Sequence, residues 1–400
     1  MEITANMPVR PILREPPEFS LVLGGPLYEM FRRAHLSGSS LEFLWRRMVV
    51  VSLFAWLPLA ILSIFDGHML GAQNLTFLRD IESHARFLVA LPVLIFAELV
   101  VHDRIAPVVK YLVDRGVVTQ EDTPKLYAAI NAALRARNSL WLELVTVLFV
   151  YTVGRWLWQH VGALQATTWY GVPDGTGMHL TPAGYWYSFV SIPIFQFILI
   201  RWYVRLGIWF QLLWRVSRLK LRLLPAHPDQ AAGIGFLGKS SYGFSPIVFA
   251  QGVLLAGLIA SRIFFQGQGL LSFKMTILAF VAFFAFVILG PLTMFTPQLS
   301  RAKRNGLSEY GTLSTAYVAE FHEKWVRGGN KTEQLLGTAD IQSLADLGNS
   351  YAVVREMQLV PFGLSDITRL AGAAVLPVLP LLLTIMPLEE LVTRLIKMIF

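Results

Sequence analysis

The stretch MVVVSLFAWLPLAILSIF, residues 48–65, decides the fold class of this chain. It contains no charged side chain, and its length is close to the roughly 20 apolar residues that a helix needs to cross the hydrocarbon core of a bilayer. A second stretch, residues 273–298, is uncharged apart from Lys274. Such runs are typical of membrane-spanning helices rather than of the core of a soluble protein.

Further apolar stretches follow the same pattern, and most carry a charge near one end. They are 87–101 with Glu98, 139–157 with Glu143 and Arg155, 185–214 with Arg201 and Arg205, 244–265 with Arg262, and 370–386 with Pro377 and Pro380. We therefore predict an all-α, polytopic transmembrane helical bundle of about seven spans with a helical cytoplasmic layer. The stretches 87–101 and 370–386 are short, and the last is either a crossing or a re-entrant segment.

The composition supports this fold class and excludes others. Hydrophobic residues make up 54% of the 400 residues and charged residues only 15%, less charge than the surface of a soluble domain needs. The absence of cysteine excludes disulfides and thiolate chemistry. A net charge of +8 in a membrane protein indicates loops that face anionic lipid, so we expect anionic phospholipids as partners and no nucleic acid.

The basic residues predict the orientation of the chain. If the N-terminus is cytoplasmic, the outer side holds few of the 34 Lys and Arg residues: Arg79, Arg86, Arg155, Arg262 and Lys274. The opposite orientation places most of them outside, against the positive-inside rule. We therefore expect a cytoplasmic N-terminus, and the C-terminus lies outside if there are seven crossings.

The order of apolar stretches and basic connections divides the chain into four regions. Residues 1–47 form a cytoplasmic N-terminal segment, and residues 48–298 form a six-span membrane domain. Residues 299–369 form a cytoplasmic helical segment with two helices separated by Gly328 and Gly329. Residues 370–400 hold the last apolar span or re-entrant segment and a tail whose pattern is typical of an amphipathic helix on a membrane surface.

A glycine-rich loop after the fourth predicted span has two possible interpretations. Residues 233–240 match the phosphate-binding pattern G-x-x-x-x-G-K-S, but that pattern needs a preceding β-strand, and here a basic extension of a membrane helix precedes it. We therefore exclude nucleotide hydrolysis. Arg218, Arg222, His227 and Lys239 instead suggest a site for an anion or a lipid head group, and the alternative is a tight turn whose charges only fix topology.

Charged side chains near the ends of spans are the other candidates for function. Glu98, His102, Glu143, Arg201 and Arg205 are predicted to line a pore or to form a polar network on the cytoplasmic side. Snorkelling and ordinary interfacial pairing explain the same residues without function. Their spacing matches no metal-ligand pattern, and we predict no catalytic residue, metal or cofactor.

Three short segments carry a resemblance to known proteins. With HPDQAAGIGFLG at 227–238, ADIQSLADL at 339–347 and PLEELVTRLIKMIF at 387–400, the chain resembles a group of uncharacterised bacterial inner-membrane proteins. The resemblance implies a bacterial cytoplasmic membrane and no particular activity. Seven spans with an inner N-terminus and an outer C-terminus are also similar to the topology of insect chemoreceptor channels, by analogy alone.

The sequence leaves more than one function open. We expect a channel, transporter or receptor for a small solute or ion, because several Pro and Gly breaks interrupt the spans. In that case Glu98 and Glu143 line the inner mouth and favour cations. We also expect the protein to assemble as a homo-oligomer. The alternatives are an interfacial enzyme acting on lipid head groups or a membrane scaffold. A cavity near the midplane favours passage, and a cleft at head-group level favours the enzyme.

Overall fold

The computed structural model describes residues 19–34, 43–70, 75–158, 160, 167–174, 177–327 and 339–384. Within these ranges the chain is almost entirely helical, and the strands described there are β1 (Gly171–Asp174) and β2 (Gly177–Leu180), which pair as one antiparallel hairpin with Gly171 opposite Leu180. The predicted all-α architecture is confirmed. The predicted tail over 387–400 and the glycine pair at 328–329 lie outside the described residues.

Seven helical segments are long and apolar enough to cross a membrane, which confirms the prediction of about seven spans. They are Leu44–Phe65, Ile81–Asp114, Leu140–Leu157, Pro182–Val216, Phe236–Gln266, Leu270–Val326 and Leu364–Thr384. The protein is therefore an integral membrane protein of the multi-pass class.

Several of these spans join more than one element. The bounds of the elements up to the fourth span are α1 (Pro26–Arg33), α2 (Leu44–Phe65), η1 (Phe77–Arg79), α3 (Ile81–His84), η2 (Ala85–Ala90), α4 (Leu91–Asp114), η3 (Gln120–Asp122), α5 (Thr123–Arg137), α6 (Leu140–Phe149), η4 (Val150–Gly154), α7 (Arg155–Leu157), α8 (Pro182–Trp186), η6 (Tyr187–Ser191) and α9 (Ile192–Val216). Those that follow are α10 (Phe236–Ser240), η7 (Ser241–Phe244), α11 (Ser245–Gln266), η8 (Leu270–Phe273), α12 (Lys274–Leu289), η9 (Gly290–Phe295), α13 (Thr296–Phe321), η10 (His322–Val326), α14 (Ala339–Glu356), α15 (Leu364–Val375) and η11 (Leu376–Thr384).

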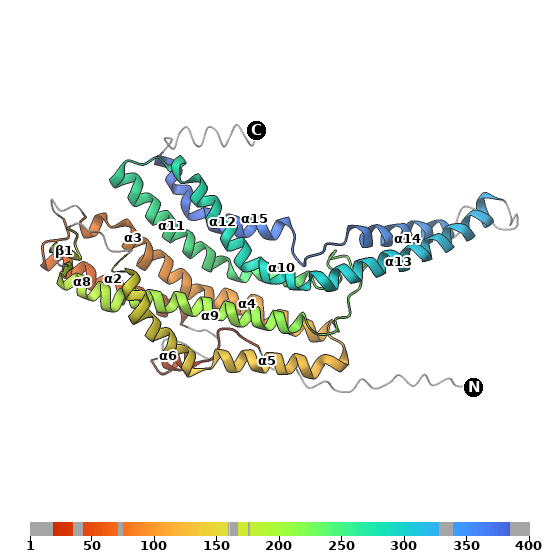
Figure 1. Ribbon diagram of the computed structural model, residues 1–400, viewed down its shortest axis with the longest axis horizontal. Coiled ribbons are helices and arrows are strands. Elements are labelled where there is room, and N and C mark those ends of the chain that lie inside the picture. Colours follow the sequence, from red (N-terminus) through yellow and green to blue (C-terminus); the bar gives the residue numbers. More distant parts are fainter. Residues whose placement is uncertain are drawn as a thin grey trace.

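The helices α4 and α9 run side by side through the middle of the bundle (Figure 1). On α4 and α9 the fully buried side chains include Leu91, Val101, Trp202 and Trp209, so both helices bury apolar faces inside the protein. The helix α4 also packs against α2 and α11, and α5 packs along α9. Because these faces are covered by neighbouring helices, Glu98 on α4 and Arg205 on α9 are buried inside the protein.

Two helices project from one end of the bundle. The six residues before the projection form the 3₁₀ segment η9, which begins at Gly290 and Pro291, and α13 then continues outward. The helices α13 and α14 pack together as an antiparallel arm (Figure 1). We call this end of the bundle the arm end and the opposite end, which carries β1 and β2, the hairpin end.

Two doubtful spans are longer than their apolar stretches. The predicted segment 87–101 is the middle of a helix over Ile81–Asp114, because Glu98 and its neighbours pair inside the protein and do not end the helix. The last span joins α15 to the 3₁₀ segment η11, which contains Pro380. At roughly 1.5 and 2.0 Å of rise per residue these segments are together long enough to cross the ~30 Å hydrocarbon core.

The helix ends follow local chemistry. Ser139 accepts a hydrogen bond from the Leu142 amide and caps α6, and Thr181 does the same for the Gly184 amide at the start of α8. The helix α5 begins at Thr123 and has Pro124 in its first turn, where the missing amide hydrogen of proline costs no hydrogen bond. The predicted region boundaries at 298/299 and 369/370 both fall inside continuous helices, α13 and α15.

Candidate functional site: a buried charge network at the arm end

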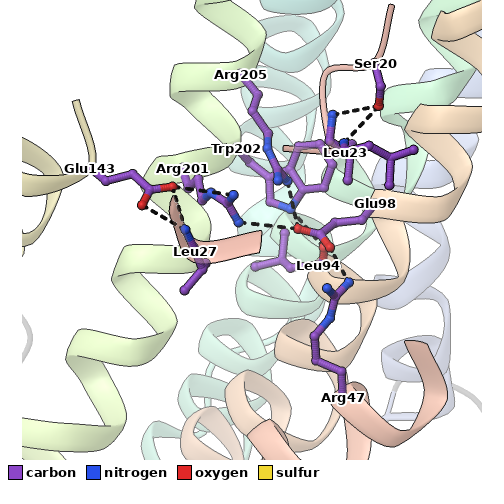
Figure 2. Close-up of polar contacts among 11 residues, drawn as sticks. Ser20, Leu23, Leu27, Arg47, Leu94, Glu98, Glu143, Arg201, Trp202 and Arg205 are labelled. Atoms are coloured by element: carbon purple, nitrogen blue, oxygen red, sulfur yellow. Dashed lines mark hydrogen bonds and ion pairs between the residues drawn. The ribbon is translucent and has the colours of Figure 1, made fainter. Parts of the chain in front are cut away.

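Glu98 on α4 lies among arginines from two other spans. Arg205 Nη1 on α9 donates to Glu98 Oε1 at 2.9 Å, and Arg47 Nη2 on α2 donates to Glu98 Oε2 (Figure 2). The side chains of Arg47 and Arg205 are only 2% and 4% exposed, so these charges are removed from both lipid and water. Buried ions of this kind persist only when they are paired.

A second carboxylate extends the network toward α6. Arg201, one turn before Arg205 on α9, lies between Glu98 and Glu143, with N–O distances of 3.6 Å to each. The Leu27 amide at the start of α1 donates to Glu143 Oε2 at 3.1 Å (Figure 2). A carboxylate at a helix N-terminus is favoured by the helix dipole, so α1 and Arg201 together hold Glu143.

The N-terminal segment closes this network from the arm end. Residues 19–34, which we call the strap, bury Phe19, Leu21 and Val22 in the core. Ser20 Oγ forms a hydrogen bond with His102 Nδ1 at 3.0 Å. Arg137 Nη1 at the end of α5 donates to the Ser20 carbonyl at 2.5 Å. The strap is therefore fastened to α4, α5 and α6 by polar contacts.

Gly24 and Gly25 let the strap pass close to the charges. Their φ angles of 125° and 92° lie in the region that favours glycine. A Cβ on Gly24 would lie 2.5 Å from Arg137 Nη2, and one on Gly25 would lie 3.6 Å from Glu143 Oε1. The backbone conformation therefore favours glycine at both positions, and the close approach of Arg137 favours it further at Gly24.

The network carries an excess of positive charge. Arg47, Arg201 and Arg205 face only two carboxylates, Glu98 and Glu143. Arg137 adds a further cation, and among the residues that the structure describes no carboxylate pairs with it. Burial, and repulsion by Arg205, lower the pKa of Arg137 to about 10. A negatively charged group would be stabilised here.

Two small cavities flank Arg201 and Arg205. One, of about 20 Å³, lies between α5, α6 and α9 and is lined by Arg137, Ser139 and Glu143 as well as the two arginines. The other, of about 10 Å³, lies on the side of Arg47 and Glu98. Spaces of roughly 10–15 Å³ with several polar neighbours hold a single water molecule or an atom of similar size.

A much larger apolar cavity begins where the network ends. It has a volume of about 700 Å³, lies among α1, α2, α6 and α9, and we call it the lateral groove. Its lining includes Val51, Phe54, Val147 and Phe197, and Glu143 is the one carboxylate among its lining residues. The groove and the 20 Å³ cavity share Glu143 and Phe197, so the two spaces adjoin. Three of the four lining helices belong to candidate spans, which places the groove at membrane depth.

A second polar network lies at the hairpin end. Arg86 Nη1 donates to the Tyr187 hydroxyl at 2.6 Å, and Ser83 Oγ lies 3.2 Å from the same hydroxyl. Asp80 accepts from Ser83 Oγ at 2.7 Å and from Trp169 Nε1 at 2.9 Å. Arg86 and Tyr187 lie on the π-helical turns η2 and η6, a geometry often found at functional sites.

Apolar packing separates the two networks along the second span. Between Arg86 and Glu98 the side chains of Ala90, Leu91 and Leu94 are at most 1% exposed. The Trp202 indole covers this region from α9 and donates to the Leu94 carbonyl at 2.8 Å. In this conformation the two charged networks are therefore separated by a closely packed apolar layer.

The glycine-rich loop binds one of its own carboxylates. Asp229 Oδ1 accepts from the Ala231 and Gly233 amides at 2.9 and 3.0 Å, and Oδ2 accepts from the Gly235 amide at 2.8 Å. Burial would raise the pKa of Asp229, but these amides and His227 lower it. These three backbone amides therefore already bind a carboxylate of the same loop.

The four predicted head-group residues lie around this loop without joining. Arg218 rests on the Trp214 ring at 5.5 Å, and His227 pairs with Asp229 at 2.8 Å. Arg222 lines a polar surface cavity of about 740 Å³, and Lys239 is exposed on α10. No hydrogen bond or ion pair between any two of the four is present in the described part of the chain. Their binding of lipid head groups stays a prediction.

The predicted polar-network residues are brought together with one exception. Ion pairs link Arg205 to Glu98, Glu98 to Arg201 and Arg201 to Glu143, whereas His102 bonds to Ser20 of the strap. Sequence reasoning missed Arg47, Arg137 and the strap, which it treated as parts of loops or of a cytoplasmic segment. The one signal for the strap was Gly24-Gly25-Pro26, a turn sequence close to the first span.

Comparisons with known proteins add no family. No protein-family model, curated protein or solved structure matches the chain.

Proposed function

We propose that the protein is a transporter or receptor for a small amphipathic molecule that enters from the bilayer through the lateral groove. The observation that supports this most strongly is the groove itself, an apolar space of about 700 Å³ between membrane spans that ends at Glu143 and the arginines. Ligand-binding cavities have volumes of roughly 300–1,000 Å³ and few, well-placed polar groups.

The closed apolar layer argues against a simple open pore. A solute that dissolves in water would have to pass Leu91, Leu94 and Trp202, all closely packed. An amphiphile avoids this layer, because its apolar part enters sideways between α2 and α6 and only its polar end meets the charges. From the sequence alone we expected Glu98 and Glu143 to favour cations. The excess of arginine around them leads us to propose ligands that are not cationic.

An enzyme acting on lipid head groups is the second candidate. It is favoured by the position of the 20 Å³ cavity, because its lining residues Ser139 and Leu142 lie at the start of α6. Against it, Glu98 and Glu143 are each paired with arginine, which leaves neither carboxylate available as a general base. A membrane scaffold would need no such groove.

We also propose a bacterial inner membrane, with the arm end in the cytoplasm. The loops at the arm end hold most of the basic residues, which supports this orientation. Contacts with anionic phospholipid through Arg218, Arg222 and Lys239, and assembly as a homo-oligomer, are part of the same proposal. Each basic residue near an anionic surface contributes about 1 kcal/mol to the free energy of lipid binding. Replacing these three residues with Gln should therefore lower the amount of anionic lipid that copurifies.

The groove can be tested by filling it. Val147 and Leu148 are neighbours on α6, but only Val147 lines the groove, and Leu148 is 64% exposed. Purified protein in a neutral detergent is titrated with a dioctanoyl phospholipid, and bound lipid is counted by native mass spectrometry. Val147→Trp should prevent binding of a lipid molecule that Leu148→Trp still binds. Equal binding by both variants would refute the groove as the ligand site.

An assay in proteoliposomes distinguishes transport of a lipid from its chemical modification. Fluorescently labelled phospholipid placed in one leaflet is followed by impermeant quenching, and extracted lipid is analysed by mass spectrometry. Transport predicts faster exchange between leaflets that Val147→Trp slows while the lipid stays intact. A new lipid species formed by the protein would decide for the enzyme.

A further inference from the structure

We infer that the cavity between α5, α6 and α9 is an oxyanion-binding site that takes the acidic end, a phosphate or carboxylate, of the molecule held in the lateral groove. This inference rests on the proposed function and names the class of ligand. Its basis is the combination of three guanidinium groups, a hydroxyl-bearing helix start and a direct junction with an apolar groove.

The lining of the cavity favours negative charge. Arg137, Arg201 and Arg205 face the cavity, and Glu143 is the one carboxylate among its lining residues. Ser139 and Thr146 add hydroxyl groups. Guanidinium groups bind phosphate and carboxylate through pairs of charge-assisted hydrogen bonds, which makes Arg the residue of choice for such ligands.

Two of the arginines are incompletely engaged. Arg201 reaches its carboxylates only at 3.6 Å, longer than a normal hydrogen bond. Arg137 bonds to the Ser20 carbonyl and to Asn138 Oδ1, both neutral acceptors. By contrast, Arg205 is held by Glu98 at 2.9 Å. An added oxyanion would therefore meet two cations that have donors to spare.

The start of α6 adds to the same field. Ser139 caps this helix, and its first turn lies beside the cavity. A helix N-terminus carries partial positive charge from unpaired amides, and it stabilises anions. The space of about 20 Å³ admits one oxygen-sized atom, so the site would hold an oxygen of the acidic group and not the whole head group.

The position of the groove decides that the anion belongs to an amphiphile. Glu143 and Phe197 line both spaces, so an apolar chain in the groove directs its polar end toward Arg201. Glu143 lies at this junction, but Arg201 and the Leu27 amide partly neutralise it. The same chemistry would also take free inorganic phosphate, and the experiment distinguishes the two sources.

The test compares three probes on full-length protein in neutral detergent: dioctanoyl phosphatidic acid, dioctanoyl phosphatidylcholine and inorganic phosphate. Calorimetric titration gives their affinities for the wild type, Arg137→Gln and the matched control Arg135→Gln. Arg135 lies two residues earlier on α5, is exposed and does not line the cavity. Thermal unfolding and gel filtration verify that each variant is folded.

We expect phosphatidic acid to bind about tenfold more tightly than phosphatidylcholine, as one charge-assisted interaction provides. Arg137→Gln should remove this preference, and Arg135→Gln should keep it. Equal affinities for the two lipids, or a preference that folded Arg137→Gln retains, would overturn the oxyanion site and leave the groove. Arg137-dependent binding of phosphate without binding of either lipid would support the site and refute the proposed function. Absence of all binding would refute both.

Discussion

Arg205 Nη1 on α9 lies 2.9 Å from Glu98 Oε1 on α4, and this contact joins the two central spans of the bundle. Arg47 on α2 donates to the other oxygen of the same carboxylate. Three spans therefore share one buried anion. Since the charges are enclosed, losing one partner leaves another without compensation, and the network holds α2, α4 and α9 in a fixed arrangement.

The first prediction follows from this arrangement. Glu98→Gln should destabilise the folded protein by about 3 kcal/mol, because breaking a buried pair leaves uncompensated charge. Differential scanning fluorimetry in detergent measures the change. The control is Glu29→Gln, which breaks a pair with Arg32 whose side chains are 59% and 45% exposed and should have little effect. Equal shifts in both variants would show that the network adds no stability.

The second prediction concerns the strap. Gly24→Ala should destabilise the strap by about 1–3 kcal/mol, since alanine disfavours a φ of 125° and its Cβ would lie 2.5 Å from Arg137 Nη2. Limited proteolysis within the strap itself should become faster. Gly269→Ala is the control, because a Cβ there meets nothing within 4 Å. If both variants resist protease as the wild type does, the close approach is unimportant.

The spans could be predicted from sequence because lipid demands long apolar runs, as in residues 48–65. The length of the second span could not, because the apolar stretch ends at residue 101, shortly after Glu98, whereas the helix continues to Asp114. The sequence also placed Arg201 and Arg205 on the fourth span, and both form ion pairs with Glu98. Arg47 and Arg137 could not be identified, because the sequence around an arginine does not show which distant carboxylate or cavity its side chain faces.

The third prediction concerns pH and the glycine-rich loop. Amide donors and His227 hold the pKa of Asp229 below its ordinary value of 3.8 despite burial. A carboxyl group with a lowered folded-state pKa adds stability above its ordinary pKa and loses it as the pH falls through the folded value. Asp229→Ala should therefore lower stability by about 2 kcal/mol at pH 7, and by much less near pH 2. Unfolding measured from pH 7 to pH 2 checks this, and a difference that stays constant with pH would contradict it.

The fourth prediction fixes the orientation. The chain lacks cysteine, so single cysteines can be introduced as reporters. Gly269, in the turn before η8, is exposed with open space around it, and Lys239 on α10 is exposed on the opposite side of the fifth span. Lys239 is preferable to Gly238, where a Cβ would lie 2.1 Å from the Pro361 carbonyl.

An impermeant maleimide added to intact cells should modify Gly269→Cys and spare Lys239→Cys, because the positive-inside rule places the basic arm end in the cytoplasm. After the cells are opened, both should react, which controls for accessibility of the thiol. The opposite pattern in intact cells would invert the topology. The lateral groove, which adjoins the arm end, would then take its amphiphile from the outer leaflet, and the arginines would face an acidic ligand arriving from outside.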